Sequence, residues 1–236
     1  MSDLTILYYT ANTIPESTGQ RIRNNLLKVI GDKFPILSVS QKPIKLSQNI
    51  CVGEIGRSKY NEYKQILIGA GEIKTKYVAC AEDDMLYSLE HFMYRPPGGV
   101  FAYETNMWYA AASYYWRWED RNQPLGMWGC ITETETLLQN LSTRYSLYPT
   151  DPLITPPGKK KSYLFWGEPG IHDQLFGMQN RHVLFESKEP TVEFLSKNSM
   201  GGRHVMGRYR LHKPEDITYN LKPFGGINKL WKTYWS

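Results

Sequence analysis

Three consecutive carboxylates, Glu82-Asp83-Asp84, have the residue types and spacing that most clearly suggest chemistry. They directly follow the apolar run 77–81, which has the composition of a buried strand. Like charges crowded beside a low-dielectric core repel one another and lose hydration, so a positive group is expected nearby. A divalent cation such as Mg²⁺ or Mn²⁺, shared with the diphosphate of a substrate, would supply that charge. The alternative is an acidic turn or helix cap without a ligand.

Two further carboxylates lie in the last third of the chain. Glu168 follows the aromatic stretch 165–167, and Asp173 stands close behind it. Either could act as a general base, and Asp173 is favoured because it lies just inside a predicted helix start, where an ionised carboxylate is stabilised. The alternative for Glu168 is a cap on the helix predicted to begin near Ile171.

The glycine-rich stretch 201–208 combines two arginines, Arg203 and Arg208, with His204. Guanidinium groups suit phosphates, and an imidazole can bind a metal ion. His204 could equally be an ordinary loop histidine, with His212 as a rival ligand.

The basic excess of the chain lies in its last 37 residues. The chain has 28 Lys and Arg against 23 Asp and Glu, a net charge of +5, and residues 200–236 hold seven basic and two acidic side chains. A basic tail on a neutral body indicates a phosphate-rich ligand or partner, or simply a solvated tail.

Alternating strand and helix patterns in the first half predict the elements that hold these side chains. Strands are predicted at 4–10, 35–40 and 77–81, and helices from Pro15 to Gly31 and over 60–71. This order is typical of an α/β fold with a mainly parallel sheet, whose ligands bind beyond the carboxyl ends of the strands. Thr10, Asn12 and the acidic triplet should therefore share one edge.

The length of 236 residues and the 41% hydrophobic content predict one domain spanning 1–236. We expect a ligand-binding half over about 1–100, a second half over about 101–199 and a basic tail over about 200–236. No apolar run approaches the roughly 20 residues of a membrane-spanning helix, and the first residues do not form a signal peptide, so a cytoplasmic protein without a membrane partner is expected. The three cysteines, Cys51, Cys80 and Cys130, are predicted to be buried thiols.

The first half resembles the nucleotide-binding half of GT-A glycosyltransferases. The resemblance rests on the strand ending Thr10-Ala-Asn12, the Gly53-x-x-x-Arg57 stretch and the acidic triplet, which maps onto the DxD motif with Glu at its first position. It implies a GT-A-like fold, a nucleotide-sugar donor with UDP favoured, and metal binding by Asp84. It also implies donor-binding roles for Thr10, Asn12, Arg57, Glu82 and Asp83, since Glu82 or Asp83 would lie near the ribose or the metal.

Two later stretches also resemble glycosyltransferase motifs. Residues 165–168 with Asp173 are similar to a Trp-Gly-x-Glu-Asn/Asp segment that contributes acceptor contacts or the base, which implies that role for Asp173 or Glu168. Residues 201–208 resemble the Gly-His-Val-Phe-Arg stretch of polypeptide N-acetylgalactosaminyltransferases. This likeness implies that His204 is a metal ligand, and Arg203 and Arg208 would close over the diphosphate.

The acceptor is predicted from weaker signals. Residues 101–128 contain nine aromatic side chains, mostly expected in the core, and Trp128 between Gly126 and Gly129 is the predicted acceptor contact. The phrases 6–12, 38–43 and 76–84 resemble small phage-type enzymes of the TET-associated group, which glycosylate hydroxymethylcytosine. The resemblance implies double-stranded DNA as acceptor, and host cytoplasm if the protein is phage-encoded. A glycan acceptor and a non-catalytic nucleotide- or carbohydrate-binding module are the alternatives.

Overall fold

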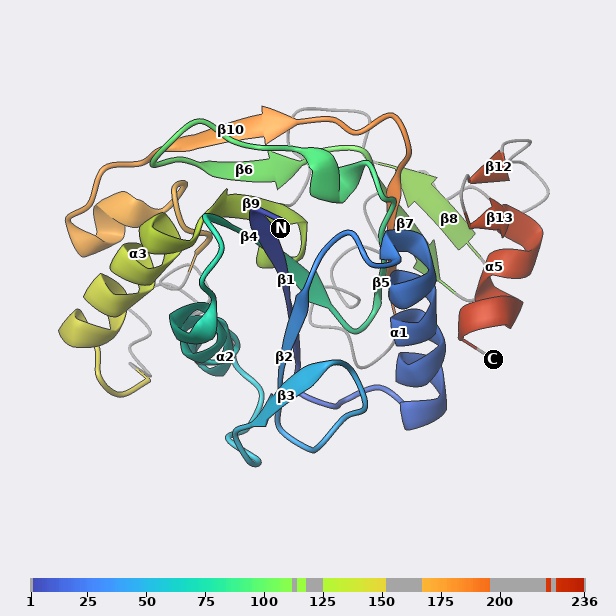
Figure 1. Ribbon diagram of the computed structural model, residues 1–236, viewed down its shortest axis with the longest axis horizontal. Helices are drawn as coiled ribbons and strands as arrows, with labels where there is room; N and C mark the ends of the chain where they lie inside the picture. Colours follow the sequence, from blue (N-terminus) through green and yellow to red (C-terminus); the bar gives the residue numbers. More distant parts are fainter. Residues whose placement is uncertain are drawn as a thin grey trace, which may run out of the picture.

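The computed structural model describes residues 2–111, 114–117, 125–151, 167–195, 220–221 and 224–235. Within them, a mixed and mainly parallel seven-stranded sheet forms the centre, in the order β10-β6-β9-β4-β1-β2-β3 (Figure 1). Only β9 runs antiparallel to its neighbours. The strands are β1 (Leu4–Thr10), β2 (Ile36–Ser40), β3 (Gln48–Cys51), β4 (Tyr77–Glu82), β6 (Phe101–Glu104), β9 (Cys130–Glu133) and β10 (His182–Phe185). The predicted α/β class is therefore confirmed.

Helices cover both faces of this sheet, as Figure 1 shows. Successive side chains of β1 point to opposite faces, and all seven are buried. Leu4, Ile6 and Tyr8 pack with α1 (Glu16–Ile30), whereas Leu7 and Tyr9 pack with α2 (Lys59–Glu72) and α3 (Thr134–Leu147). Burial on both faces explains why the sequence of this strand is continuously apolar.

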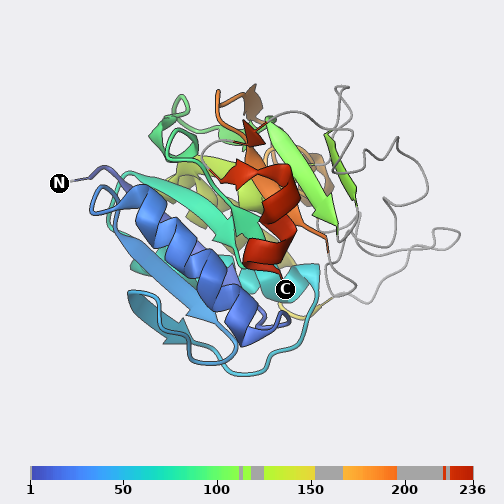
Figure 2. The same ribbon diagram turned by 90° about the vertical axis from the view of Figure 1, so that its right-hand side faces the viewer.

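A second sheet of four strands lies on the α1 side, in the order β5-β11-β7-β8. Its strands are β5 (Met85–Leu86), β7 (Met107–Ala111), β8 (Tyr114–Arg117) and β11 (Thr191–Phe194). The hairpin β12 (Asn220–Leu221) and β13 (Gly225–Gly226) leads into α5 (Ile227–Tyr234), drawn in red in Figure 2 between α1 and the strands β7 and β8. Short 3₁₀ helices occupy His91–Met93, Met127–Gly129 and Asp173–Phe176.

The strands and helices predicted up to residue 82 are confirmed with bounds close to those expected. The aromatic stretch from 101 contains strands that the sequence did not reveal. On β7, Met107 and Tyr109 enter one core cluster while Trp108 and Ala110 enter another. Both faces are buried, so no polar and apolar alternation exists to be detected.

Two expectations concern the chain as a whole. Cys80 and Cys130 are buried as predicted, but the prediction is wrong for Cys51, which is exposed because it ends the edge strand β3. Among the described residues, no helix is long and apolar enough to cross a membrane.

Candidate functional site

The acidic triplet lies at the carboxyl end of β4, beside the carboxyl end of β1. The parallel register sets Tyr9 opposite Glu82, and the Tyr9 hydroxyl donates a hydrogen bond to Glu82 Oε1 at 2.5 Å. The Thr10 hydroxyl donates to a carboxylate oxygen of Asp83. Neighbouring parallel strands thus bring together residues separated by more than seventy positions, as the pattern predicted.

Asn12 shapes the loop that follows β1. Its backbone is left-handed, with φ of 54°, and its N–H donates to Thr10 Oγ1 at 2.8 Å. Its side-chain oxygen accepts hydrogen bonds from the N–H groups of Gln41 and Lys42 at 2.9 and 2.8 Å. Asn12 therefore ties this loop to the end of β2.

The 53–57 stretch forms the next wall of the same edge. The side-chain amide of Gln41 donates to the Gly56 carbonyl at 2.8 Å and accepts from the Gly56 N–H at 3.1 Å. Arg57 is exposed. Burial raises the pKa of Asp83, whereas the hydrogen bond from Thr10 and the positive charges of Arg23 and Arg57 lower it. The charge of Arg57 thus acts on Asp83 of the acidic triplet.

Sequence reasoning missed Glu193, which the small sheet brings to the triplet. Glu193 lies opposite Met85 in the β11–β5 pairing, and the Phe194 N–H donates to the Asp84 carbonyl at 2.8 Å. An acidic residue inside the otherwise uncharged run Thr191–Phe194 was the available signal. Glu62, Glu82, Asp83, Asp84 and Glu193 are called the carboxylate cluster below.

Burial raises the pKa of each carboxyl group in the carboxylate cluster. Burial, followed by the charge of Glu62, raises the pKa of Glu82 to about 8, and burial raises that of Glu193 to about 7. The pKa of Asp84 lies well above its ordinary value because of burial and the charges of Glu82, Glu193 and Asp83. A cation placed here would reverse these shifts.

The Asp84 carboxylate fits a divalent cation. Its Oδ1 atom is buried and has no hydrogen-bond partner within the described part of the chain. In the same ranges, no three His, Cys, Asp or Glu side chains converge into a ready-made metal site. Mg²⁺ is commonly held by one or two carboxylates together with water and substrate phosphates, and Asp84 suits that kind of site.

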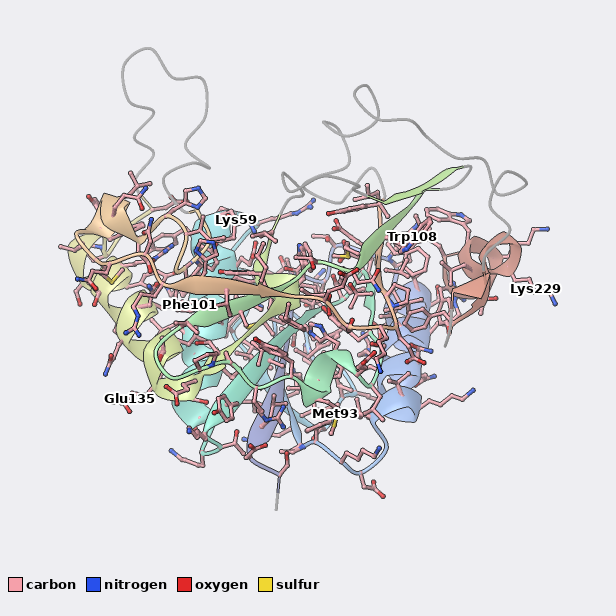
Figure 3. The ribbon with its side chains drawn as sticks, turned by 90° about the horizontal axis from the view of Figure 1, so that it is seen from above. Lys59, Met93, Phe101, Trp108, Glu135 and Lys229 are labelled. Atoms are coloured by element: carbon pink, nitrogen blue, oxygen red, sulfur yellow. The ribbon has the colours of Figure 1, made fainter. Side chains whose placement is uncertain are left out.

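Lys59 lies on the α2 side of the cluster and is labelled in Figure 3. Its Nζ atom is 2.9 Å from Glu62 Oε1. Burial alone would lower the pKa of Lys59, but the charges of Glu62, Glu168 and Glu82 raise it well above its ordinary value. The charge of Lys59 therefore acts on both Glu82 of the triplet and Glu168.

The two predicted bases have different surroundings. The side chain of Glu168 is 18% exposed, and its Oε2 lies 3.7 Å from Nδ1 of His172. Asp173 is 2% exposed, and its carboxylate accepts hydrogen bonds from Arg144, Asn140 and the Gly170 N–H at 2.7 to 2.8 Å. Glu168 is partly exposed, whereas Asp173 is enclosed.

Trp128 supports the triplet through its backbone. The Tyr87 hydroxyl donates to the Trp128 carbonyl and accepts the Glu82 N–H, each at 3.0 Å. The Trp128 side chain belongs to a core cluster and is 8% exposed. The predicted donor-binding and metal-binding residues Arg203, Arg208 and His204 lie outside the described residues.

Solved structures with a similar arrangement of elements include glycosyltransferases and a nucleotidyl transferase. A glycosyltransferase involved in the glycosylation of the major capsid of PBCV-1 has a TM-score of 0.48 and 11% identity, over 80% of this chain and 91% of that one. The apo-form glycosyltransferase GlyE of Streptococcus pneumoniae TIGR4 has a TM-score of 0.49 and 8% identity, over 99% of this chain and 60% of that one. The nucleotidyl transferase Mth528 from Methanothermobacter thermautotroptrophicus has a TM-score of 0.46 and 10% identity, over 79% of this chain and 88% of that one.

No protein-family profile and no curated protein matches the sequence. Likenesses of this size describe how the elements are arranged, so the function proposed below rests on the chemistry of the site itself.

Proposed function

We propose that this protein is a metal-dependent glycosyltransferase that moves a sugar from a nucleotide-sugar donor to an acceptor hydroxyl. The observation that carries the proposal is the buried Asp84 oxygen without a hydrogen-bond partner in the described part of the chain, inside the carboxylate cluster at the ligand edge of the sheet. A cation would stabilise the ionised form of such a cluster, and a diphosphate brings the remaining oxygen ligands.

The residues have the following proposed roles. Asp84 and His204 would hold Mn²⁺ or Mg²⁺, which when bound acts as a Lewis acid for the departing diphosphate. Thr10, Asn12, Arg57, Glu82 and Asp83 form the nucleotide side of the site, with UDP favoured. Arg203 and Arg208 are the proposed diphosphate contacts.

We propose Glu168 rather than Asp173 as the base that deprotonates the acceptor. A base must reach the acceptor proton, and Glu168 is partly exposed and interacts electrostatically with Lys59, which is paired with Glu62 of the carboxylate cluster. Asp173 is enclosed by three donors, which argues against direct contact with an acceptor. Trp128 stays the proposed acceptor contact.

For the acceptor we propose a hydroxymethylated pyrimidine, 5-hydroxymethylcytosine in double-stranded DNA. The basic excess of residues 200–236 supports it, since DNA binding depends on phosphate neutralisation. The exposed side chains Lys229 and Lys232 of α5 belong to that excess. A glycan acceptor would not require this basic excess.

Calorimetric titration with UDP tests the proposal. Wild-type protein should bind UDP in Mn²⁺ and lose at least tenfold in affinity, about 1.4 kcal/mol, with EDTA. Asp84→Asn should bind UDP equally weakly with and without Mn²⁺ while keeping its circular dichroism spectrum.

The matched control is Glu72→Gln, which removes an exposed carboxylate at the opposite end of α2 from Lys59, outside the carboxylate cluster. It should bind UDP like the wild type. Equal UDP affinity for wild type and Asp84→Asn in Mn²⁺ would contradict the assignment of Asp84.

A further inference from the structure

Beneath the Glu168 loop lies a buried ion pair that the proposed reaction does not use directly. Arg144 of α3 donates from Nη2 to Asp173 Oδ1 at 2.8 Å, and the two side chains are 0% and 3% exposed. The Asn140 amide donates to the same oxygen at 2.8 Å. The Arg144 guanidinium also stacks on Phe176, 4.3 Å from the ring centroid.

The two side chains of this ion pair make hydrogen bonds to the loop backbone on both sides of Glu168. Arg144 Nη1 donates to the Gly167 carbonyl at 2.7 Å, directly before Glu168. The Gly170 N–H, two residues after Glu168, donates to Asp173 Oδ2 at 2.7 Å. The Glu168 carbonyl in turn accepts the N–H groups of Ile171 and His172 at 3.1 and 3.0 Å. The backbone of Glu168 is thereby fixed from two directions.

Stability alone is a weak reason for such a pair. Desolvating two charges costs several kcal/mol, and apolar residues of similar volume often give an equally stable core. A buried pair with several hydrogen bonds can instead select a single conformation. Here the selected conformation is that of the loop that carries Glu168.

We propose that Arg144 and Asp173 are positioning residues that hold the Glu168 carboxylate at the acceptor side of the site. The inference rests on the proposed function, because it takes Glu168 as the base. It gives Asp173 an indirect role: the carboxylate anchors the loop and does not touch the acceptor. A displacement of about 1 Å in a reacting group can cost on the order of a hundredfold in rate.

A double-mutant cycle between Arg144 and Glu168 tests this. The rate measured is Mn²⁺-dependent release of nucleoside diphosphate from the UDP- or GDP-sugar that the wild type hydrolyses fastest, and the UDP dissociation constant is measured beside it. Arg144→Lys keeps the charge but cannot reach both Asp173 and the Gly167 carbonyl in the same way. It should slow release at least tenfold with UDP affinity unchanged.

In the Glu168→Gln background, Arg144→Lys should have no further effect, because a positioning residue acts only through the group that it positions. The inference would be overturned if the two substitutions slowed release multiplicatively in the double variant, or if the Arg144→Lys variant released nucleoside diphosphate at the wild-type rate. If the wild-type protein does not bind UDP in a Mn²⁺-dependent way, the proposed function itself is contradicted.

Two further variants guard against a merely structural explanation. Leu141→Ala empties a fully buried position on the same helix and should lower the melting temperature while leaving release intact. Asn140→Ala removes one hydrogen bond to Asp173 and keeps the ion pair, so it should slow release less than Arg144→Lys. If Leu141→Ala slows release as much as Arg144→Lys at equal loss of stability, the positioning role is wrong.

Discussion

Glu82 and Glu193, with pKa values raised to about 8 and about 7, make the free energy of unfolding depend on pH. Between their ordinary value of 4.5 and these raised values, the native state holds more protons than the unfolded state. The free energy of unfolding should therefore fall as pH rises from about 5 to 8, by at most about 1.4 kcal/mol per unit for each carboxylate.

Urea unfolding at several pH values in EDTA measures this slope. Glu193→Gln should reduce it, and Mn²⁺ should raise stability most at the high-pH end, where the cluster is ionised. Glu54→Gln is the control, because its exposed side chain lies outside the cluster. A stability that rises with pH over this range in the wild type would contradict the raised pKa values.

Individual residues of the site were predictable only where strand order determines proximity. Thr10 and Asp83 follow two strands that parallel topology makes neighbours, so their contact could be expected. Glu193 reaches Asp84 through the β11–β5 pairing, and no local pattern in the sequence encodes which strands pair. The enclosure of Asp173 by Arg144 is a tertiary contact of the same unpredictable kind.

At the scale of elements, α2 approaches the sheet through Gly69. A Cβ atom added there would lie 2.3 Å from Leu7 Cδ1 and 2.9 Å from Val39 Cγ2, whereas one added at Gly71 meets nothing within 4 Å. Gly69→Ala should therefore destabilise the protein by about 1–3 kcal/mol through overpacking. Gly71→Ala, on the same helix, should stabilise it by up to about 1 kcal/mol.

Denaturant unfolding of the two alanine variants measures both effects. Because α2 carries Lys59 and Glu62 at its start, Gly69→Ala should also weaken UDP binding, which Gly71→Ala leaves unchanged. Equal stabilities of the two variants would mean that α2 does not pack on β1 and β2 at Gly69.

Elements were predictable where periodicity and stop signals agree. Apolar spacing and the closing Gly31 define α1, and a continuous apolar run defines β1. The strands β6 and β7 escaped because both of their faces are buried, and β5 has only two residues. Strands this short or this uniformly apolar can be assigned only when the strands that pair with them are known.

The whole molecule carries a net charge of +5, and two of its lysines project from α5; Lys229 is labelled in Figure 3. If duplex DNA is the acceptor, affinity should fall steeply with salt, and Lys229→Gln with Lys232→Gln should lower the slope of log K against log salt by about 2. UDP affinity should stay unchanged, because these residues lie outside the carboxylate cluster.

Filter binding across salt concentrations measures the slope. The matched control is Lys28→Gln with Lys33→Gln, which removes the same charge from exposed positions at the amino-terminal edge of the strands. If both double variants change the salt slope equally, DNA binding reflects general electrostatic attraction and not a contact by α5. If the wild-type protein does not bind duplex DNA, a glycan is the preferred acceptor.

The packing of α5 on α1 has a consequence for synthesis on the ribosome. Asn25 of α1 donates to the Tyr234 hydroxyl at 2.8 Å across 209 residues of sequence, and Leu230 joins Ile22 in one core cluster. During translation, α1 therefore emerges from the ribosome long before α5 has been synthesised. Until then, the apolar surface of α1 that packs against α5 is exposed to chaperones and to other nascent chains. Glu193 also emerges long after the acidic triplet, so the polypeptide acquires its complete carboxylate cluster only once β11 has been synthesised.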